Sequence, residues 1–411
     1  MNRTKLVVAA STGLSVVATT LILPILAPLI RELGLSVSQG GLMVSIGSVV
    51  MVAAAPFWGT VSDRHGCKAV IVSGFLGVLV GYAIYTLVVI VGLSGGLTAA
   101  TVFLALTASR AVVGVFLSAV PAGAQALMAD STTARDRAGG MAIIGAAMGL
   151  GLIAGPAVSG LLVTGGITWP LFAAIALCAL GAAVALLFLK AAPVKAPVRA
   201  RKASLFSLAL QPWLVAGILL WIAIATVQIS AGFYFQDRLG LDGGAAARML
   251  SLALTLVGIG MFAVQFVQVR VLRLAPRILV LAGAGTWIAG LLLLLSAADP
   301  LSCYLAYALF GLGSGFLLPG VMAGASLAVG EDGQGVAAGL VSASQGIGFI
   351  IGPAASTTLY AWDKALPFWV LAGLMLLLAL KFAIVPLLLP QFGAARSRAE
   401  RAGRIGSHGH T

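Results

Sequence analysis

The chain has 411 residues, of which 61% are apolar and only 9% are charged, whereas an ordinary soluble domain carries about 25% charged residues. So few charges cannot cover a soluble protein of this size, and disordered chains are poorer in apolar residues, so both classes are excluded. The formal net charge of +13 does not indicate a nucleic-acid partner, because the charges stand in short runs between apolar segments. The composition predicts an all-α protein that crosses a lipid bilayer many times.

A membrane-spanning helix needs about 20 mostly apolar residues, and twelve segments meet this requirement. The first segment follows a short basic start that resembles a signal peptide. Its apolar run over residues 6–30 is too long for a cleaved signal, so we expect an uncleaved span. The twelve predicted spans are 6–29, 41–61, 70–92, 100–128, 139–164, 170–189, 212–235, 247–269, 278–297, 302–328, 337–360 and 367–389.

The longest predicted loop divides the chain into two halves. Residues 190–211 contain proline and five basic residues but no acidic residue. We interpret them as a basic cytoplasmic linker between an N-terminal six-helix bundle over 1–189 and a C-terminal six-helix bundle over 212–390. A cytoplasmic tail is expected over 391–411.

The distribution of positive charge predicts the orientation, because Lys and Arg gather in cytoplasmic loops. With the N-terminus inside, the cytoplasmic segments hold 18 of the 24 Lys and Arg residues, the outer segments hold four and the spans hold two. We therefore expect both termini on the cytoplasmic side of a bacterial-type inner membrane.

The two halves contain an internal repeat. Gly149–Ser159 in the fifth span aligns with Gly346–Ser356 in the eleventh at an offset of 197 residues, and seven of eleven positions are identical. Two repeated six-span halves joined by a basic loop are typical of a transporter in which two pseudo-symmetric bundles move around a site at the membrane midplane.

The turn after the second span carries Gly59-Thr-Val-Ser-Asp-Arg-His-Gly-Cys-Lys68. It closely resembles the loop 2–3 signature of the major facilitator superfamily, Gly-x-x-x-Asp-Arg-x-Gly-x-Lys, at Gly59, Asp63, Arg64, Gly66 and Lys68. The glycines permit a tight turn with close packing, and Asp63 offers a carboxylate to a helix N-terminus or an arginine. The resemblance implies a cytoplasmic gate in which the start of the eleventh span faces Asp63. A loop that only set topology would need neither the aspartate nor the two glycines.

The fifth span contains Gly151-x-x-x-Gly155-Pro156-x-x-x-Gly160. This resembles the antiporter motif of proton-coupled exporters in the same superfamily, although Ser159 replaces the first glycine of its usual Gly-Gly end. Glycine at every fourth position leaves a smooth helix face, and Pro156 favours a kink. Ordinary small-residue packing also explains these glycines, but the resemblance favours export over import.

Arg110 stands in the fourth span, roughly 15 Å from its outer end at a rise of 1.5 Å per residue. A charge at this depth is costly and indicates a functional site, unless backbone carbonyls satisfy it. The resemblance implies a role in proton coupling or anion binding. All eleven acidic residues fall in predicted loops or ends, so we expect an anionic substrate to supply the counter-charge of Arg110. Proton coupling must then use Asp63, an acid at a loop end, or a proton carried by the substrate.

Further candidates for substrate contact are polar and aromatic residues in the spans that line the pathway of this superfamily. They are Trp221 and Gln228 in the seventh span, Tyr307 in the tenth and Gln345 in the eleventh. Each of them could instead bond a neighbouring helix.

Across nearly its whole length the chain resembles the twelve-span drug and metabolite:proton antiporters. The resemblance implies a monomeric secondary transporter that exports a small amphipathic or anionic molecule, such as a drug, metabolite or siderophore, by alternating access with protons and without a cofactor or metal. Import or facilitated diffusion of an organic anion is the alternative. A membrane-embedded enzyme or receptor is disfavoured, because the spans lack catalytic His, Asp or Ser–His sets and no loop could hold a signalling domain. The Gly-x-x-x-x-Gly-Lys-Ser/Thr motif for ATP is absent from the sequence.

Overall fold

The computed structural model describes residues 3–132, 136–189, 210–268, 274–329 and 334–388. Within these ranges the chain is helical and contains no strand. Most of the predicted linker and the predicted tail over 391–411 lie outside the described residues. The helices are α1 (Arg3–Thr20), α2 (Leu23–Glu32), α3 (Val37–His65), α4 (Cys67–Leu93), α5 (Ala99–Leu117), α6 (Ala119–Asp130), α7 (Arg137–Leu162), η1 (Val163–Gly165), α8 (Trp169–Phe188), α9 (Gln211–Leu239), α10 (Gly243–Val267), α11 (Pro276–Ser296), α12 (Pro300–Val329), α13 (Gln334–Trp362) and α14 (Leu366–Leu388).

Twelve helical segments are long and apolar enough to cross a membrane, which confirms the predicted number of spans. The first span is made of α1 and α2, and the fourth of α5 and α6. Each break comes just before a proline, Pro24 in α2 and Pro121 in α6. Proline cannot donate a backbone hydrogen bond to the carbonyl four residues earlier, so the helix is interrupted there.

Several helices extend beyond the predicted spans, which corrects the assignment of their charged ends to loops. Arg31 and Glu32 belong to α2, Asp63 belongs to the last turn of α3, and Asp237 belongs to the last turn of α9. The hydropathy pattern misses these turns because charged residues reduce the average while the backbone remains helical.

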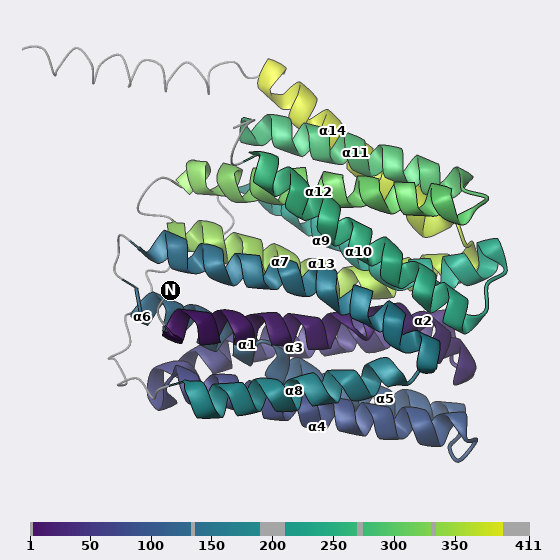
Figure 1. Cartoon of the computed structure of the whole chain (residues 1–411). Helices are drawn as coiled ribbons and strands as arrows, with labels where there is room; N and C mark the ends of the chain where they lie inside the picture. The colour runs from purple at the N-terminus through teal and green to yellow at the C-terminus, as the bar shows by residue number, and fades with distance from the viewer. Residues whose placement is uncertain (1–2, 133–135, 190–209, 269–273, 330–333, 389–411) are drawn as a thin grey trace, which may run out of the picture.

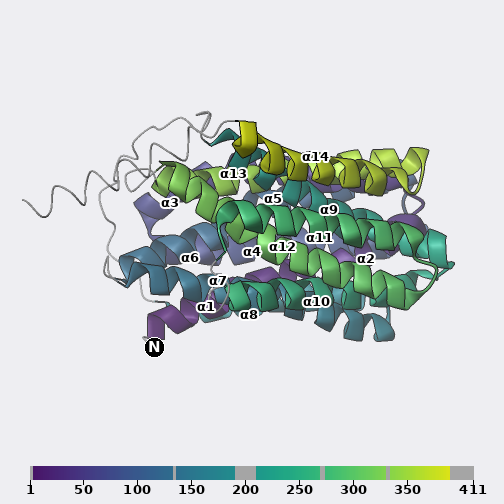
Figure 2. The same ribbon diagram turned by 90° about the horizontal axis from the view of Figure 1, so that it is seen from above.

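The twelve spans run along a common axis in two bundles, α1–α8 and α9–α14 (Figure 1, Figure 2). Within the bundles, α4 packs on α5 and α8, and α11 packs on α12 and α14. The bundles meet mainly through two pairs of helices, α3 with α13 and α7 with α10, and α2 adds further contacts with α9 and α10. This arrangement confirms the predicted all-α fold of two pseudo-symmetric six-helix bundles.

The sequence repeat corresponds to a repeat in packing. Gly151 and Gly155 lie where α7 touches α1, and a methyl group at either position would collide with α1. Gly348 and Gly352 occupy the equivalent places where α13 touches α9. Small residues therefore allow the close approach of α7 to α1 and of α13 to α9.

The contacts between the bundles are concentrated at one end, where α2 and α9 stop and α3 begins; we call this the closed end. Here Gly41 of α3 packs against Pro353 of α13, and Ser45 Oγ accepts a hydrogen bond from the backbone N of Ala354 at 3.0 Å. Toward the opposite end, where α3 stops and α4 begins, α3 becomes exposed, and Phe57 is 57% exposed.

Gly66 forms the turn between α3 and α4 at the opposite end, with φ +86° and ψ 151°. This backbone region is essentially restricted to glycine, since a Cβ atom is strained there. This backbone conformation therefore explains how Gly66 permits the predicted tight turn.

We expect Gly66→Ala to lower the free energy of unfolding by about 1–3 kcal/mol, the usual strain of such a conformation. Gly59→Ala is the matched control in the same motif, because Gly59 lies inside α3 and a methyl group there meets no atom within 4 Å. Denaturant unfolding of the purified variants measures the difference. Equal losses in both variants would contradict this explanation.

Candidate functional site

Arg110 lies within α5 and touches α3, where a methyl group at Gly47 would come within 3.1 Å of its backbone oxygen. Its guanidinium carbon lies 5.6 Å from the ring centre of Tyr85 on α4, a cation–π distance. None of the described residues accepts a hydrogen bond from Arg110 or pairs with its charge, and its Nε atom is buried without a partner. A buried donor without an acceptor is energetically unfavourable, so the group is available to an anion.

Trp221 of α9 faces α13, and its ring centre lies 5.6 Å from that of Phe349. Gln345 lies one turn before Phe349, and Gln228 lies two turns after Trp221 on the same side of α9. Both glutamines are half-buried, and no residue in the described ranges hydrogen-bonds to either side-chain amide. The two amides therefore keep their capacity to bind a polar ligand.

Arg110 and Trp221 lie at a similar depth in the two bundles. Two positions of α3 contact α13, one at Ala354 and the other at Gly346. Gly47, which touches Arg110, lies between these two positions of α3. The same stretch of α13 packs on Trp221. The structure thus places these two predicted residues near the same level of the bundle interface.

Tyr307 of α12 is completely buried, and its hydroxyl donates to the backbone oxygen of Val227 at 2.8 Å. Its ring packs against Phe310 and Phe235 at centroid distances of 5.3 and 5.7 Å. In this conformation the Tyr307 hydroxyl supports α9 within the C-terminal bundle and is not open to a substrate.

The predicted gate motif lies at the opposite end of the molecule. Asp63 and Arg64 are exposed, and neither forms an ion pair or hydrogen bond within the part of the chain that the structure describes. Lys68 Nζ donates to the backbone oxygen of Leu186 in α8 at 2.8 Å, inside the same bundle. The close packing expected at Gly59 is not present, since the space around it is open.

The glycines of the predicted antiporter motif face two different neighbours. Gly151 and Gly155 contact α1 within the N-terminal bundle, whereas a methyl group at Gly160 would come within 2.9 Å of Ser251 Cβ in α10. Pro156 stands inside α7, which continues on both sides of it. The motif therefore packs α7 both within its bundle and across the bundle interface.

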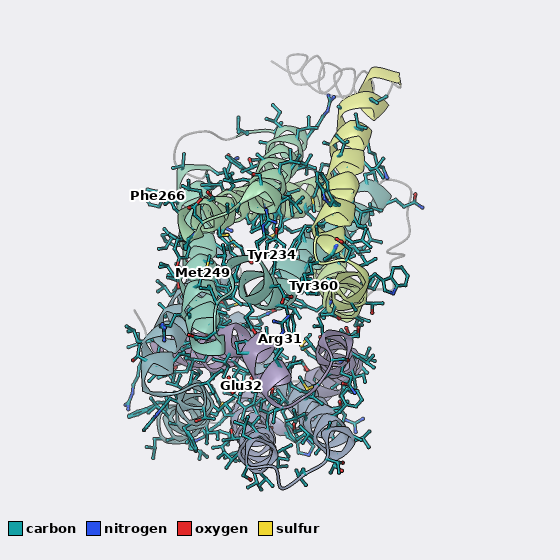
Figure 3. All side chains as sticks on the ribbon, turned by 90° about the vertical axis from the view of Figure 1, so that its right-hand side faces the viewer. Arg31, Glu32, Tyr234, Met249, Phe266 and Tyr360 are labelled. Carbon is teal, nitrogen blue, oxygen red and sulfur yellow. The ribbon has the colours of Figure 1, made fainter. Side chains whose placement is uncertain are left out.

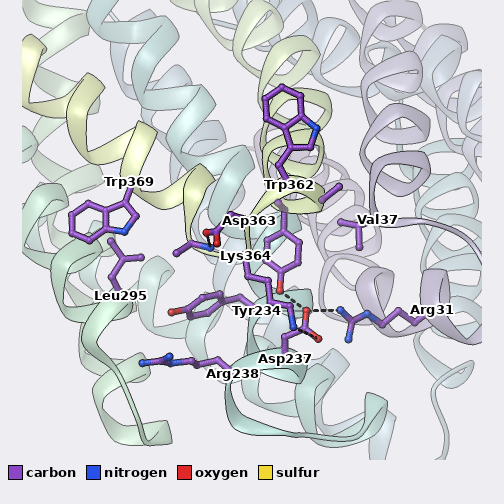
Figure 4. Close-up of a pocket in the computed structure, with 13 residues that line it drawn as sticks. Arg31, Val37, Tyr234, Asp237, Arg238, Leu295, Trp362, Asp363, Lys364 and Trp369 are labelled. Carbon is purple, nitrogen blue, oxygen red and sulfur yellow. Dashed lines mark hydrogen bonds and ion pairs between the residues drawn. The ribbon is translucent and has the colours of Figure 1, made fainter.

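A cluster of charged residues that the sequence reasoning missed joins the bundles at the closed end (Figure 3, Figure 4). Arg31 Nη2 lies 2.7 Å from Asp237 Oδ2, and Arg31 Nη1 donates to Gln236 Oε1 at 3.3 Å. The Tyr360 hydroxyl donates to the same Asp237 oxygen at 2.7 Å, and Lys364 Nζ lies 3.6 Å from Asp237 Oδ1. We call these five residues the Arg31 cluster.

The Arg31 cluster borders a pocket of about 740 Å³ at the closed end (Figure 4). Its wall includes the aromatic residues Tyr234, Trp362 and Trp369 and the basic residue Arg238. The Arg238 Nε donates to the backbone oxygen of Ala297 at 3.2 Å. Because Asp237 and Asp363 also line it, the pocket combines aromatic surface with charges of both signs.

Other acidic residues near this end act as helix caps. Asp242 accepts from the backbone N of Ala245 at 2.7 Å, and Asp299 accepts from the backbone N of Ser302 at 3.0 Å. Hydrogen bonds from the Ser302 side chain and backbone lower the pKa of Asp299 below its ordinary value. Asp237, by contrast, forms an ion pair with a basic side chain of the other bundle.

The sequence contained one signal for the Arg31 cluster, the charges of opposite sign at the ends of the first and seventh spans. It could not pair them, because Arg31 and Asp237 are 206 residues apart. Their contact depends on how the two bundles dock.

The sequence model of a family described as Major Facilitator Superfamily matches residues 8–272 and 244–407. The chain is 30% identical over 164 residues to the tetracycline resistance protein, class C, of Escherichia coli, which covers 39% of this chain and 38% of that protein. It is 29% identical over 170 residues to multidrug resistance protein 2 of Bacillus subtilis, covering 41% and 40% of the two chains. The matched part thus spans less than half the length of these curated relatives.

Among solved structures, the fold is similar to that of a bacterial homologue of the human lysosomal transporter Spinster in an inward-facing and unoccupied conformation. The TM-score is 0.71, with 92% of this chain and 95% of that chain covered. The sequences are 14% identical, so this likeness concerns the fold.

Proposed function

Since the chain belongs to the Major Facilitator Superfamily, and is therefore a transporter that crosses the membrane twelve times, we propose that it exports a small amphipathic or anionic molecule by alternating access in exchange for protons. The names of the matched relatives, tetracycline and multidrug resistance proteins, support export of small molecules. The matched regions are partial, so the cargo is argued from the residues of this chain.

The observation that carries the proposal is the unpaired guanidinium of Arg110. Its buried Nε lacks an acceptor among the described residues, and the carboxylates of the spans lie near helix ends. An anionic cargo supplies the missing counter-charge, whereas a permanent cation would be repelled. Trp221, Gln228 and Gln345 would contact the rest of the cargo.

The positive-inside distribution assigns the closed end to the outer side and the opposite end to the cytoplasm. In that orientation the bundles are joined on the outer side, and the exposed Asp63 and Arg64, which pair with no described residue, lie on the cytoplasmic side. This arrangement supports a state that takes cargo from the cytoplasm. We propose that movement of the bundles then brings the Asp63 motif against the start of α13 and opens the outer side.

Proton coupling is tested in inverted membrane vesicles with an acidic interior, with tetracycline and benzoate as probes. We expect addition of a transported probe to release internal protons. An exporter that exchanges cargo for protons carries protons out of the vesicle lumen as the cargo enters it. Vesicles with the Arg110→Gln variant serve as the control. Uptake of a probe without proton release would instead favour the alternative of an organic-anion facilitator.

A further inference from the structure

Arg31 belongs to the N-terminal bundle, but the described hydrogen-bond, ion-pair and ring partners of its side chain all belong to one helix of the C-terminal bundle. The guanidinium pairs with Asp237 at 2.7 Å, contacts Gln236 at 3.3 Å, and lies 5.5 Å from the ring centre of Phe233. All three residues are in the last two turns of α9. Separation of the bundles at the closed end therefore removes every one of these contacts at once.

Asp237 does not lose its partners in the same way. The Tyr360 hydroxyl at 2.7 Å and the Lys364 ammonium at 3.6 Å come from α13 and the segment that follows it. They belong to the same bundle as Asp237 and remain beside it when the bundles separate. Opening thus leaves Asp237 with a positive partner and a hydrogen-bond donor, while Arg31 is left without a carboxylate.

Glu32 is adjacent to Arg31 but does not replace Asp237. Consecutive residues on a helix point in directions about 100° apart and do not face each other. The Glu32 carboxylate lies instead against the start of α10, where a methyl group at Gly243 would come within 2.9 Å of Oε1. Arg31 is therefore the one member of the Arg31 cluster whose charge is uncompensated after opening.

From this asymmetry we infer a second anion site, which forms at Arg31 when the closed end opens. It takes the carboxylate of a small aromatic anion, which replaces Asp237 as the partner of Arg31 and prevents the bundles from closing again. Tyr234, Trp362 and Trp369 line the adjacent pocket from the C-terminal bundle, so they would face the apolar part of such an anion across the opened end. The inference rests on the proposed alternating access, and the anion arrives either as exported cargo or from the outer medium.

The test measures the distance between the bundles at the closed end in the full chain, reconstituted in lipid nanodiscs. Spin labels are attached at Ser94→Cys, at the end of α4, and at Leu301→Cys, at the start of α12; both positions are exposed. The three native cysteines, which are buried, are replaced by alanine. Benzoate is the probe, and neutral benzamide is its control.

Two variants remove the same ion pair but differ in the proposed site. Asp237→Asn and Arg31→Gln should both increase the long-distance population relative to the parent protein. Benzoate should raise that population further in Asp237→Asn, by about twofold, and leave Arg31→Gln unchanged. Benzamide should have no effect on either variant. The combined exchange Arg31→Asp with Asp237→Arg restores the ion pair but places a cation beside Lys364, so it should return most of the distance distribution to that of the parent protein, which checks that both positions tolerate substitution.

Added to Asp237→Asn, Lys364→Gln removes another positive charge of the Arg31 cluster but keeps Arg31, so the response to benzoate should remain. When Arg110→Gln, which removes the proposed cargo site, is added to Asp237→Asn, a retained response identifies an anion bound from the outer medium, whereas a response seen only with Arg110 intact identifies cargo. The inference is overturned if Arg31→Gln responds to benzoate as strongly as Asp237→Asn, or if Asp237→Asn does not respond. The distance measurement requires no transport. A failure of the proposed export would therefore appear in the vesicle assay, whereas a failure of this inference would appear in the response of the distances to benzoate.

Discussion

Transport of anionic cargo is expected to fall at least about 100-fold when Arg110 is replaced by glutamine. Removing one partner of a buried ion pair costs about 3–5 kcal/mol, and each 1.4 kcal/mol is a factor of ten in affinity. The assay is the initial rate of benzoate or tetracycline uptake into inverted vesicles, normalised to the amount of protein.

The stability of the Arg110→Gln variant separates a functional role from a structural one. Arg110 donates to no described acceptor, so its replacement should leave the thermal midpoint unchanged or raise it. Arg110→Lys, which keeps the charge but loses the planar donor arrangement, should retain part of the activity. Normal transport by Arg110→Gln would refute the site, and a strongly lowered thermal midpoint would indicate a structural arginine.

Valine at Gly155 or at Gly352 is expected to destabilise the protein by about 1–3 kcal/mol or more, the usual range for overpacking. A methyl group at Gly155 would collide with Thr20 of α1, and one at Gly352 would come within 2.7 Å of Ala225 Cβ of α9. The two positions are related by the repeat, so the effects should be similar. Denaturant unfolding and the fraction of monodisperse protein after purification measure them.

Gly149 provides the control for this pair, because it belongs to the same repeat but a methyl group there meets no atom within 4 Å. Gly149→Val should therefore unfold close to the wild-type midpoint. A loss as large as that of Gly155→Val would show that valine itself, rather than the contact with α1, is responsible.

The local patterns of the chain predicted most of the fold. Apolar length marked the twelve spans, and the spacing of Gly149–Ser159 and Gly346–Ser356 marked their pseudo-symmetric relation. The span ends were wrong where charged residues continue a helix, as at Arg31, Asp63 and Asp237. Helix formation there depends on backbone hydrogen bonds and on neighbouring helices rather than on hydropathy.

The candidate site was only partly accessible to such reasoning. A lone arginine in an apolar segment is visible in a sequence, and so is the lack of carboxylates near it, as for Arg110. Tyr307 shows the opposite case, since its hydroxyl bonds a carbonyl of α9 that lies 80 residues earlier. A polar residue in a span looks the same in the sequence whether it faces a pathway or a neighbouring helix.

The sequence by itself determined that this protein is a twelve-span membrane protein of two related halves with an arginine inside its fourth span. These properties follow from the length, polarity and spacing of short segments, which the hydrophobic bilayer selects directly. Only the tertiary structure decided that Arg31 meets Asp237, that Tyr360 and Lys364 share that carboxylate, and that the bundles are joined at one end. Such contacts join elements about 120 to 200 residues apart, so they exist only once the helices have packed and the bundles have docked.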